Sequence, residues 1–181
     1  MMNKQDIRRL MRRRLADVTM CDNTTSSHKV FERIEALPEF VLANNILVYN
    51  SLPGELSTQA FIEKWSGVKH LYLPRVNGDD LDVLPYDSAN LHVGAYGILE
   101  PDGDNIVDPA VIDLAVVPGL GFDSRGYRVG HGKGYYDRLL SRMNAVIVGV
   151  AFEFQVFDTI IVEPHDRPVN MVITPRSMFT I

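Results

Sequence analysis

The sequence predicts an α/β fold, a three-layer sandwich with a mostly parallel sheet and additional helices at the N-terminus. Three observations support this class. Short apolar runs of strand length alternate with helical segments, which is typical of parallel α/β proteins. The chain has 181 residues, so we expect residues 1–181 to form one domain. Hydrophobic residues make up 46% and charged residues 23%, which is ordinary for a globular protein with a buried core.

Two helices are expected before the sheet begins. Asn3 can cap a helix that runs to about Met20, with apolar residues at three- and four-residue steps on one stripe. The polar residues 22–27 predict a break. A second helix is expected over 27–37, and Pro38 would stop or bend it.

The body of the domain follows from apolar runs separated by turn residues. Continuous apolar runs of four to seven residues are typical of buried parallel strands. In chain order we expect a strand at 46–49, a helix at 57–66, a strand at 68–73 stopped by Pro74, a turn at 79–80, a strand at 81–86, mostly loop over 87–108, a strand at 112–117, a glycine-rich loop at 118–133, a helix at 134–143, a strand at 145–151 and a last strand at 171–174.

Composition excludes several classes of function. Lys and Arg number 18 against 23 Asp and Glu, a net charge of −5, so general nucleic-acid binding is not expected. The single Cys21 excludes an internal disulfide and a cysteine-built zinc site. No run approaches the roughly 18 apolar residues of a transmembrane helix, so no membrane partner is expected.

The basic N-terminus bears on localisation. It has no apolar segment of the secretory type, and an Arg-rich transit peptide is disfavoured because Asp6 and Asp17 interrupt it. We therefore expect a cytoplasmic protein that acts as a monomer on small molecules.

The most informative segment is the glycine-rich loop that follows the strand at 112–117. Gly130, Gly132 and Gly134 alternate just before the expected helix, and Arg128 and Lys133 add positive charge. Glycines allow close approach of the backbone to a ligand, and free N–H groups at a helix start bind phosphate. The pattern therefore predicts a phosphate-binding loop.

Two common phosphate motifs do not fit this loop. A Walker loop needs glycine at Tyr127 and Ser or Thr at Gly134. The dinucleotide pattern needs a third glycine at Tyr135, or a glycine or alanine at Ser124 if it starts at Gly119. A plain flexible loop is the alternative, with His131 a solvated residue, Tyr135 and Tyr136 core aromatics and Asp137 a partner of the helix dipole.

Residues 118–139 resemble the signature of the 5-formyltetrahydrofolate cyclo-ligase family. The start Pro-Gly-Leu-Gly-Phe-Asp at 118–123 matches directly, and Tyr-Tyr-Asp follows the glycines at 135–137. Three weaker features fit in the expected order: Lys4-x-x-x-Arg8, Ser-Leu-Pro-Gly-Glu-Leu-Ser-Thr at 51–58, and His165-Asp166.

The resemblance implies a fold similar to the sugar-phosphate isomerase and CoA-transferase-like proteins. It also implies ATP-dependent conversion of 5-formyltetrahydrofolate to 5,10-methenyltetrahydrofolate. The formyl oxygen would be phosphorylated, and attack by N10 would close the ring. Two alternatives stay open: a sugar-phosphate isomerase-like enzyme, and a non-catalytic nucleotide- or folate-binding module.

The resemblance also assigns roles to residues, with the helical segment 1–38 contributing to the ATP site. Catalysis would depend on Lys133, Arg128 and Glu55. The residues expected to contact ATP are Lys4, Arg8, Arg128, Val129, Gly130, His131, Gly132, Lys133, Gly134, Tyr135 and Tyr136. Those expected to contact the folate are Asn50, Glu55, His131, Gly132, Lys133, Gly134, Tyr135 and Tyr136. Asp137 and Asp166 would hold Mg²⁺, which prefers oxygen ligands and shares them with phosphates.

Overall fold

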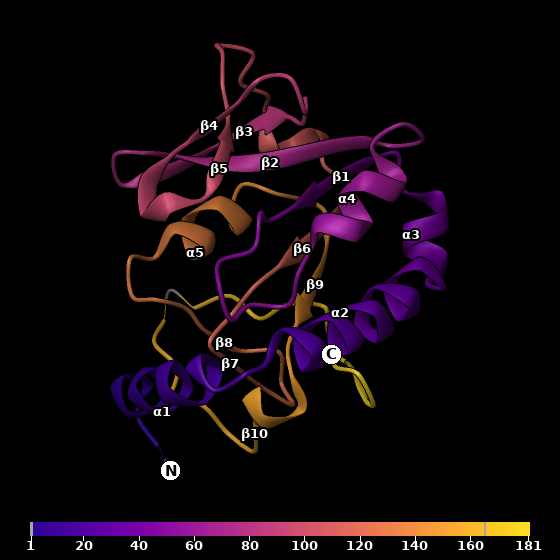
Figure 1. Ribbon diagram of the computed structural model, residues 1–181. Coiled ribbons are helices and arrows are strands. Elements are labelled where there is room, and N and C mark those ends of the chain that lie inside the picture. Colours follow the sequence, from indigo (N-terminus) through magenta and orange to yellow (C-terminus); the bar gives the residue numbers. More distant parts are fainter. Residues whose placement is uncertain (1, 165) are drawn as a thin grey trace.

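The computed structural model describes residues 2–164 and 166–181 and is built on a seven-stranded sheet with the order β12-β11-β9-β6-β1-β2-β3 (Figure 1). Its helices are α1 (Lys4–Ala16), α2 (Met20–Glu35), α3 (Pro38–Leu42), α4 (Gln59–Trp65) and α5 (Tyr135–Leu140), with short 3₁₀ turns η1 (Ala95–Gly97), η2 (Pro109–Val111) and η3 (Glu153–Gln155). Its strands are β1 (Asn45–Val48), β2 (His70–Asn77), β3 (Asp80–Pro85), β4 (Leu91–Val93), β5 (Leu99–Pro101), β6 (Leu114–Val117), β7 (Gly121–Asp123), β8 (Arg128–Val129), β9 (Val146–Val150), β10 (Val156–Phe157), β11 (Met171–Ile173) and β12 (Met178–Thr180).

The five central strands of the large sheet are parallel, and the two edge strands β3 and β12 are antiparallel. The first parallel strand, β1, lies between the second, β2, and the third, β6. The order therefore reverses between β1 and β6, and open α/β sheets bind ligands at such a switch point, beyond the carboxyl ends of the strands.

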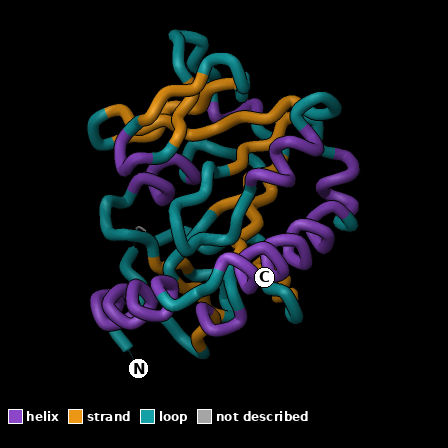
Figure 2. Tube along the Cα trace, viewed as in Figure 1, coloured by secondary structure: helices purple, strands orange, loops and turns teal. Residues whose placement is uncertain are grey.

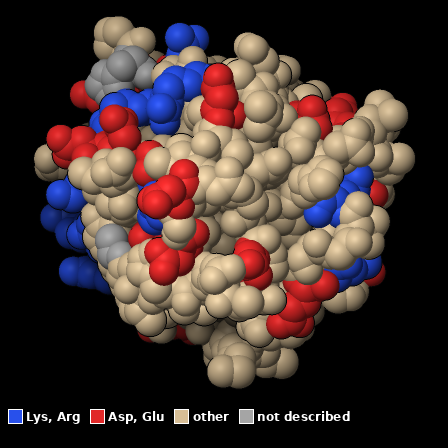
Figure 3. Space-filling view, turned by 90° about the horizontal axis from the view of Figure 1, so that it is seen from above, with Lys and Arg blue, Asp and Glu red and all other residues tan. Residues whose placement is uncertain are grey.

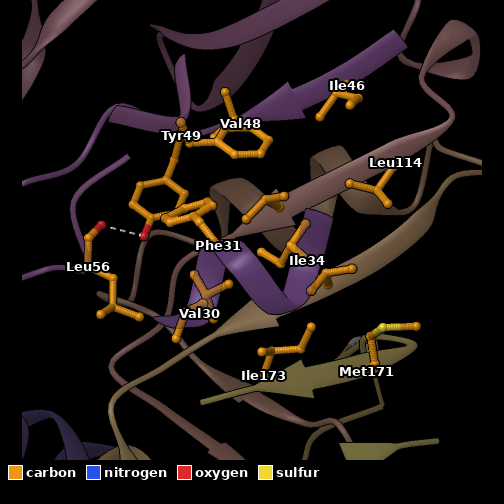
Figure 4. Packing of buried hydrophobic residues seen from close by; sticks show 14 of the residues in the cluster. Val30, Phe31, Ile34, Ile46, Val48, Tyr49, Leu56, Leu114, Met171 and Ile173 are labelled. Carbon is orange, nitrogen blue, oxygen red and sulfur yellow. Dashed lines mark hydrogen bonds between the residues drawn. The ribbon is translucent and has the colours of Figure 1, made fainter. Parts of the chain in front are cut away.

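Alternate residues of the parallel strands face two separate cores. Ile46 and Val48 of β1 pack on one side with α2, while Leu47 packs on the other with Leu139 of α5. Figure 4 shows the first core, in which Phe31 and other α2 side chains lie against the sheet. Helices thus cover both faces, and the predicted mostly parallel α/β sandwich is confirmed.

The boundary between the first two helices differs from the prediction. α1 ends at Ala16, and Thr19 accepts a hydrogen bond from the backbone N–H of Asp22 at the start of α2. Residues 22–27 are therefore helical, not a break. Several of these polar side chains are exposed, while Ser27 is buried and hydrogen-bonded to Asn23. The cap at Thr19 decides where the helix begins.

Strand β2 continues through Pro74, which we expected to end it. Pro74 faces Val83 of β3, and β1 pairs with β2 only as far as Tyr72. Because the β1–β2 pairing ends at Tyr72, Pro74 lies beyond it and is accommodated as a proline is on an edge strand.

Several short strands lie in segments where no strand was expected. β4 and β5 form a hairpin within 87–108, β7 and β8 form another within the glycine-rich loop, and β12 adds an antiparallel edge. Figure 2 shows that loop segments nevertheless fill much of the region between α5 and α1. These strands are only two or three residues long, too short to leave a periodic signal.

α1 lies apart from the sheet and packs against the β7–β8 hairpin. Its apolar stripe, Ile7, Met11 and Leu15, is buried, so its basic residues face outward or toward the loops. Among the described residues no helix has the length and apolarity needed to cross a bilayer. The face seen in Figure 3 is mostly uncharged, with acidic groups scattered over it and basic groups at its upper left, its left margin and its right side.

Candidate functional site

A cleft of about 470 Å³ opens at the switch point of the sheet. Tyr49 and Asn50, which follow β1, line it together with Pro118 and Gly119, which follow β6. Its volume is in the range of small-molecule sites. The cleft therefore lies where the topology of an α/β sheet places a ligand.

The glycine-rich loop forms one wall of this cleft. Gly132 has φ of +105°, a left-handed backbone conformation that strongly favours glycine. Gly130 lies so close to the guanidinium of Arg128 that a Cβ there would collide with it. The carbonyl of Gly130 also accepts a 2.9 Å hydrogen bond from Nε of Arg8, so α1 is fastened directly to the loop.

One face of α1 supplies a row of cations to the cleft. Lys4, Arg8 and Arg12 are spaced four residues apart, so they share a helix face, and all three line the cavity. Arg12 was not expected, although its spacing from Arg8 was a signal in the sequence. Together with Lys133 of the loop, these side chains suit an anionic ligand such as a polyphosphate.

Lys4 also links the start of α1 to the loop that precedes β11. Its Nζ donates to Oδ1 and Oδ2 of Asp166 at 2.7 and 2.6 Å and to Glu163 at 3.0 Å. Burial would lower the pKa of Lys4, but the hydrogen bonds to Asp166 and Glu163 outweigh it, so the pKa is raised. Lys4 therefore stays charged. His165, which the resemblance paired with Asp166, lies outside the described residues.

Arg128 is almost buried, with its side chain 5% exposed, and it forms an ion pair with Asp137 at 3.0 Å. Its guanidinium also lies over the ring of Tyr136, 5.3 Å from the centroid. Its Nε is buried, with no hydrogen-bond partner in the described chain. The ring and the carboxylate hold Arg128 at the floor of the cleft, where it can meet ligand charge without reorganising.

Glu55 faces the glycine loop from the opposite wall. Its Oε2 accepts a 2.9 Å hydrogen bond from the backbone N–H of Leu52, and its Oε1 lies 3.6 Å from Nε2 of His131. The Glu55 side chain is 13% exposed, so it is anchored but accessible. Burial raises the pKa of Tyr49 and of Tyr136, and the charge of Glu55 raises both further, so both phenols are neutral at physiological pH.

Asn50 and Tyr135 complete the predicted set at the mouth of the cleft. Asn50 donates to the carbonyl of Leu99 at 2.9 Å, which ties β1 to the β4–β5 hairpin. Tyr135 lies under the guanidinium of Arg138, and a hydrogen bond with Tyr96 raises its pKa.

The structure brings together all but one of the predicted site residues. The residues that line the cleft as expected are Lys4, Arg8, Asn50, Glu55, Arg128, Gly130, His131, Gly132, Lys133, Gly134, Tyr135, Tyr136, Asp137 and Asp166. Val129 does not line it. Its side chain is fully buried in the core, and its carbonyl accepts from the N–H of Leu120, so it supports the loop from behind.

Sequence reasoning missed the wall opposite α1. Its lining residues are Leu52, Pro74, Val76, Leu81, Tyr96, Ile98 and Glu100. Most of them come from β2, β3 and the β4–β5 hairpin, which we expected to be ordinary strand and loop. Their role depends on long-range packing, and no local motif marks them.

The two predicted metal ligands were tested against their surroundings. Asp137 and Asp166 both line the cleft, each paired with a cation, Arg128 and Lys4 respectively. Nowhere in the described ranges do three or more His, Cys, Asp or Glu side chains gather in a way that could hold a metal ion. Two carboxylates that line one cleft have the oxygen donors that suit Mg²⁺ when phosphate oxygens supply further ligands.

The fold and the cleft together are those of an α/β enzyme with a cation-lined cleft at the switch point of its sheet. The chain belongs to the 5-formyltetrahydrofolate cyclo-ligase family, whose model matches residues 1–175. The 5-formyltetrahydrofolate cyclo-ligase of Escherichia coli (strain K12) is 29% identical over 180 residues, covering 94% of this chain and 99% of its own. That of Mus musculus is 25% identical over 190 residues, covering 94% and 92%.

Solved structures show the same likeness. The 5,10-methenyltetrahydrofolate synthetase of Aquifex aeolicus is 34% identical and superposes with a TM-score of 0.90, covering 99% of this chain and 93% of that one. A synthetase from Mycoplasma pneumoniae shares the fold, with a TM-score of 0.78 at 21% identity. The family suggested by the sequence motifs is thus confirmed.

Proposed function

We propose that this protein converts 5-formyltetrahydrofolate to 5,10-methenyltetrahydrofolate with hydrolysis of ATP to ADP and phosphate. The observation that carries the proposal is that one cleft joins a row of cations from α1 and the glycine loop to an anchored carboxylate, Glu55. The family match supplies the folate substrate and the class of reaction.

The first step places charge where the cations lie. The formyl oxygen attacks the γ-phosphorus, the bond to the β-phosphate oxygen breaks, and ADP leaves. Lys133 and Arg128 oppose the negative charge that shifts during this transfer, while Lys4 and Arg8 hold the triphosphate. Such phosphoryl transfer depends mainly on positioning and electrostatics, which these fixed cations provide.

The second step uses the opposite wall. Phosphorylation makes an iminium phosphate at N5, whose positive charge the carboxylate of Glu55 stabilises. N10 then attacks the activated carbon, phosphate leaves, and N10 loses its proton. Asn50, Tyr135 and Tyr136 would hold the folate in the geometry for ring closure. Such fixed orientation raises the rate far above that of a random encounter.

Asp137 and Asp166 would hold Mg²⁺ together with the triphosphate, and the ion would neutralise part of the phosphate charge. Asp137→Asn should therefore raise the Mg²⁺ concentration needed for half-maximal rate by about tenfold. Asp104→Asn, at an exposed position in the loop after β5, is the matched control. An unchanged Mg²⁺ profile in Asp137→Asn would remove this residue from the metal site.

The proposal is tested by mixing the purified protein with 5-formyltetrahydrofolate and MgATP and following the near-ultraviolet absorbance of the methenyl product. An ATP-dependent increase, absent without ATP, is the expected result. Binding of either ligand without turnover would favour the non-catalytic binding module. The absence of both binding and turnover would favour a sugar-phosphate isomerase-like enzyme.

We also propose that the chain acts as a monomeric domain in the cytoplasm, without a nucleic-acid or membrane partner. The net charge of −5 supports the absence of a nucleic-acid partner. Light scattering during size-exclusion chromatography tests the monomer, since a dimer would elute with twice the mass.

A further inference from the structure

We propose that Glu100 binds the fused-ring end of the folate by accepting two adjacent N–H donors, those of the ring nitrogen N3 and of the neighbouring 2-amino group. This inference rests on the proposed function and adds a residue that the family motifs in the sequence do not include. Glu100 belongs to β5 and lines the cleft at the wall formed by β2, β3 and the β4–β5 hairpin.

The carboxylate of Glu100 is buried yet only weakly satisfied by the protein. The residue is 3% exposed. Among the described residues, one donor reaches its side chain, the N–H of Val76, at 3.4 Å. A carboxylate can accept about four hydrogen bonds, and buried polar groups in proteins are generally paired. The remaining acceptor capacity of Glu100 thus lies at the wall of a ligand cleft.

The chain makes room for this carboxylate at a specific point. Gly94 lies against Glu100 so closely that a Cβ added to Gly94 would collide with the carboxylate. The other residues of this wall are mostly apolar: Pro74, Val76, Leu81 and Ile98 line the same end of the cleft. A single buried acceptor within apolar surface suits a flat heterocycle with polar edges and apolar faces.

The order of groups along the cleft assigns the heterocycle. The cations Lys4, Arg8 and Arg12 lie on α1, while Glu100 belongs to the β4–β5 hairpin at the opposite end of the molecule in Figure 1. The triphosphate must bind at the cationic end, because its charge needs those partners. The γ-phosphate and the formyl group must meet between the two ends, where Glu55 lies opposite the loop. The rings attached to the formyl group then extend toward Glu100.

The donor pattern distinguishes the two substrates. The fused ring of the folate presents N3–H beside its 2-amino group, two donors that match the two oxygens of a carboxylate as a guanidinium does. Adenine presents one amino group beside an acceptor nitrogen, so it can satisfy only one oxygen. A site with a buried acceptor discriminates strongly against ligands that leave it unpaired.

A purely structural role for Glu100 predicts something different. In that case its carboxylate would only link the β4–β5 hairpin to the N–H of Val76 on β2. An amide oxygen could accept that hydrogen bond equally well, so Glu100→Gln would be silent. If Glu100 accepts hydrogen bonds from two ligand donors, Glu100→Gln places an amide N–H opposite a ligand N–H. Two donors cannot pair, so the variant should bind the folate more weakly.

The test compares Glu100→Gln with the unmodified protein and with Glu63→Gln, a matched change on the exposed surface of α4. We expect Glu100→Gln to raise the KM for 5-formyltetrahydrofolate about tenfold or more, with the KM for ATP within about twofold and an unchanged melting temperature. A folate analogue that lacks the 2-amino group should bind the unmodified protein more weakly than 5-formyltetrahydrofolate does. The substitution Glu100→Gln should weaken the binding of this analogue only a little further.

Each other result has a defined meaning. Three results would overturn the inference. They are an unchanged KM for the folate, equal rises in the KM for folate and for ATP, and a loss of affinity in Glu100→Gln that adds to the loss seen with the analogue. Calorimetric binding of 5-formyltetrahydrofolate to the unmodified protein separates this failure from that of the proposed function. Binding without turnover would contradict the proposed reaction, and the Glu100 comparison would then use the calorimetric Kd values in place of KM. No folate binding would overturn both.

Discussion

Lys4 and Asp166 are 162 residues apart in the chain, yet two hydrogen bonds of 2.6 and 2.7 Å join them at the edge of the cleft. The bond fixes the start of α1 against the C-terminal loop and directs a cation toward the site. Lys4 thus has two tasks, one in the fold and one in binding the triphosphate, and the two can be separated by measurement.

Replacing Lys4 should affect both tasks with different pH dependences. Lys4→Met should raise the KM for ATP about tenfold, because one phosphate partner is lost. It should also lower the free energy of unfolding. Since the pKa of Lys4 is raised above 10.5 in the folded state, this difference is fully present below pH 10.5 and declines above it, as the folded state loses the proton. Urea unfolding at pH 8 and at pH 11 measures it, and a difference that grew with pH would contradict the ion pair.

Lys133→Ala should affect the reaction and leave the fold unchanged. The side chain is exposed, and the contact to Arg138 uses the Lys133 carbonyl, which the substitution keeps. We expect kcat to fall about 100-fold or more while the melting temperature stays within a degree or two, because one cation facing the transferred phosphate is lost. Steady-state kinetics with Lys29→Ala, an exposed change on α2, as the control will measure this effect. Full activity in Lys133→Ala would exclude a catalytic role.

Glu55→Gln should discriminate between the two substrates. The amide oxygen can still accept from the N–H of Leu52, so the loop should keep its shape. Loss of the charge that stabilises the iminium should lower kcat about tenfold or more and weaken folate binding, while the Kd for ATP is unchanged. Isothermal titration with each ligand provides the second readout. Equal weakening of both ligands would show a general disturbance of the cleft instead.

Tyr49 should make the fold sensitive to alkali. Burial raises the pKa of its hydroxyl above the ordinary 10.0, and the hydroxyl donates to the carbonyl of Leu56 at 2.7 Å (Figure 4). Above pH 10 the unfolded state releases this proton while the folded state keeps it, so stability falls with rising pH. Tyr49→Phe should cost about 1 kcal/mol near pH 7.

Above pH 10, Tyr49→Phe should also show a shallower decline in the free energy of unfolding, by up to about 1.4 kcal/mol per pH unit. Chemical denaturation of both proteins between pH 9 and pH 11 gives the two slopes. Parallel slopes would mean that the Tyr49 hydroxyl does not keep its proton in the folded state.

The sequence predicted the parts of the site that depend on local chemistry. The glycines at 130, 132 and 134 and the cations around them form a contiguous pattern, and the family motifs extend it to Glu55 and Lys4. The sheet order was not predicted, since no local signal says that β1 lies between β2 and β6. Pro74 shows the same limit: it is a strand breaker locally, but it is tolerated because β1 has ended beside it.

The wall that carries Glu100 could not be predicted for a related reason. Glu100 precedes Pro101 in a stretch that is predicted to be loop, and its burial arises from packing against Gly94 and Val76. Val129 shows the converse case, because it stands inside the motif but faces the core. A motif therefore identifies the segment that forms the site, while the fold decides which of its side chains reach the ligand.

The pairing of β1 with β6 has a consequence for how the protein acquires activity. Ile46 lies opposite Leu114, so forming this pair closes a long stretch of chain that contains β2 to β5. Contacts between residues far apart in sequence form slowly, because chain entropy must be lost first. A chain that has assembled β1, β2 and β3 alone holds Asn50 and Glu55 but has not yet brought in the loop that follows β6. During refolding from urea, nucleotide binding should therefore return only in the slowest phase, after most secondary structure has formed.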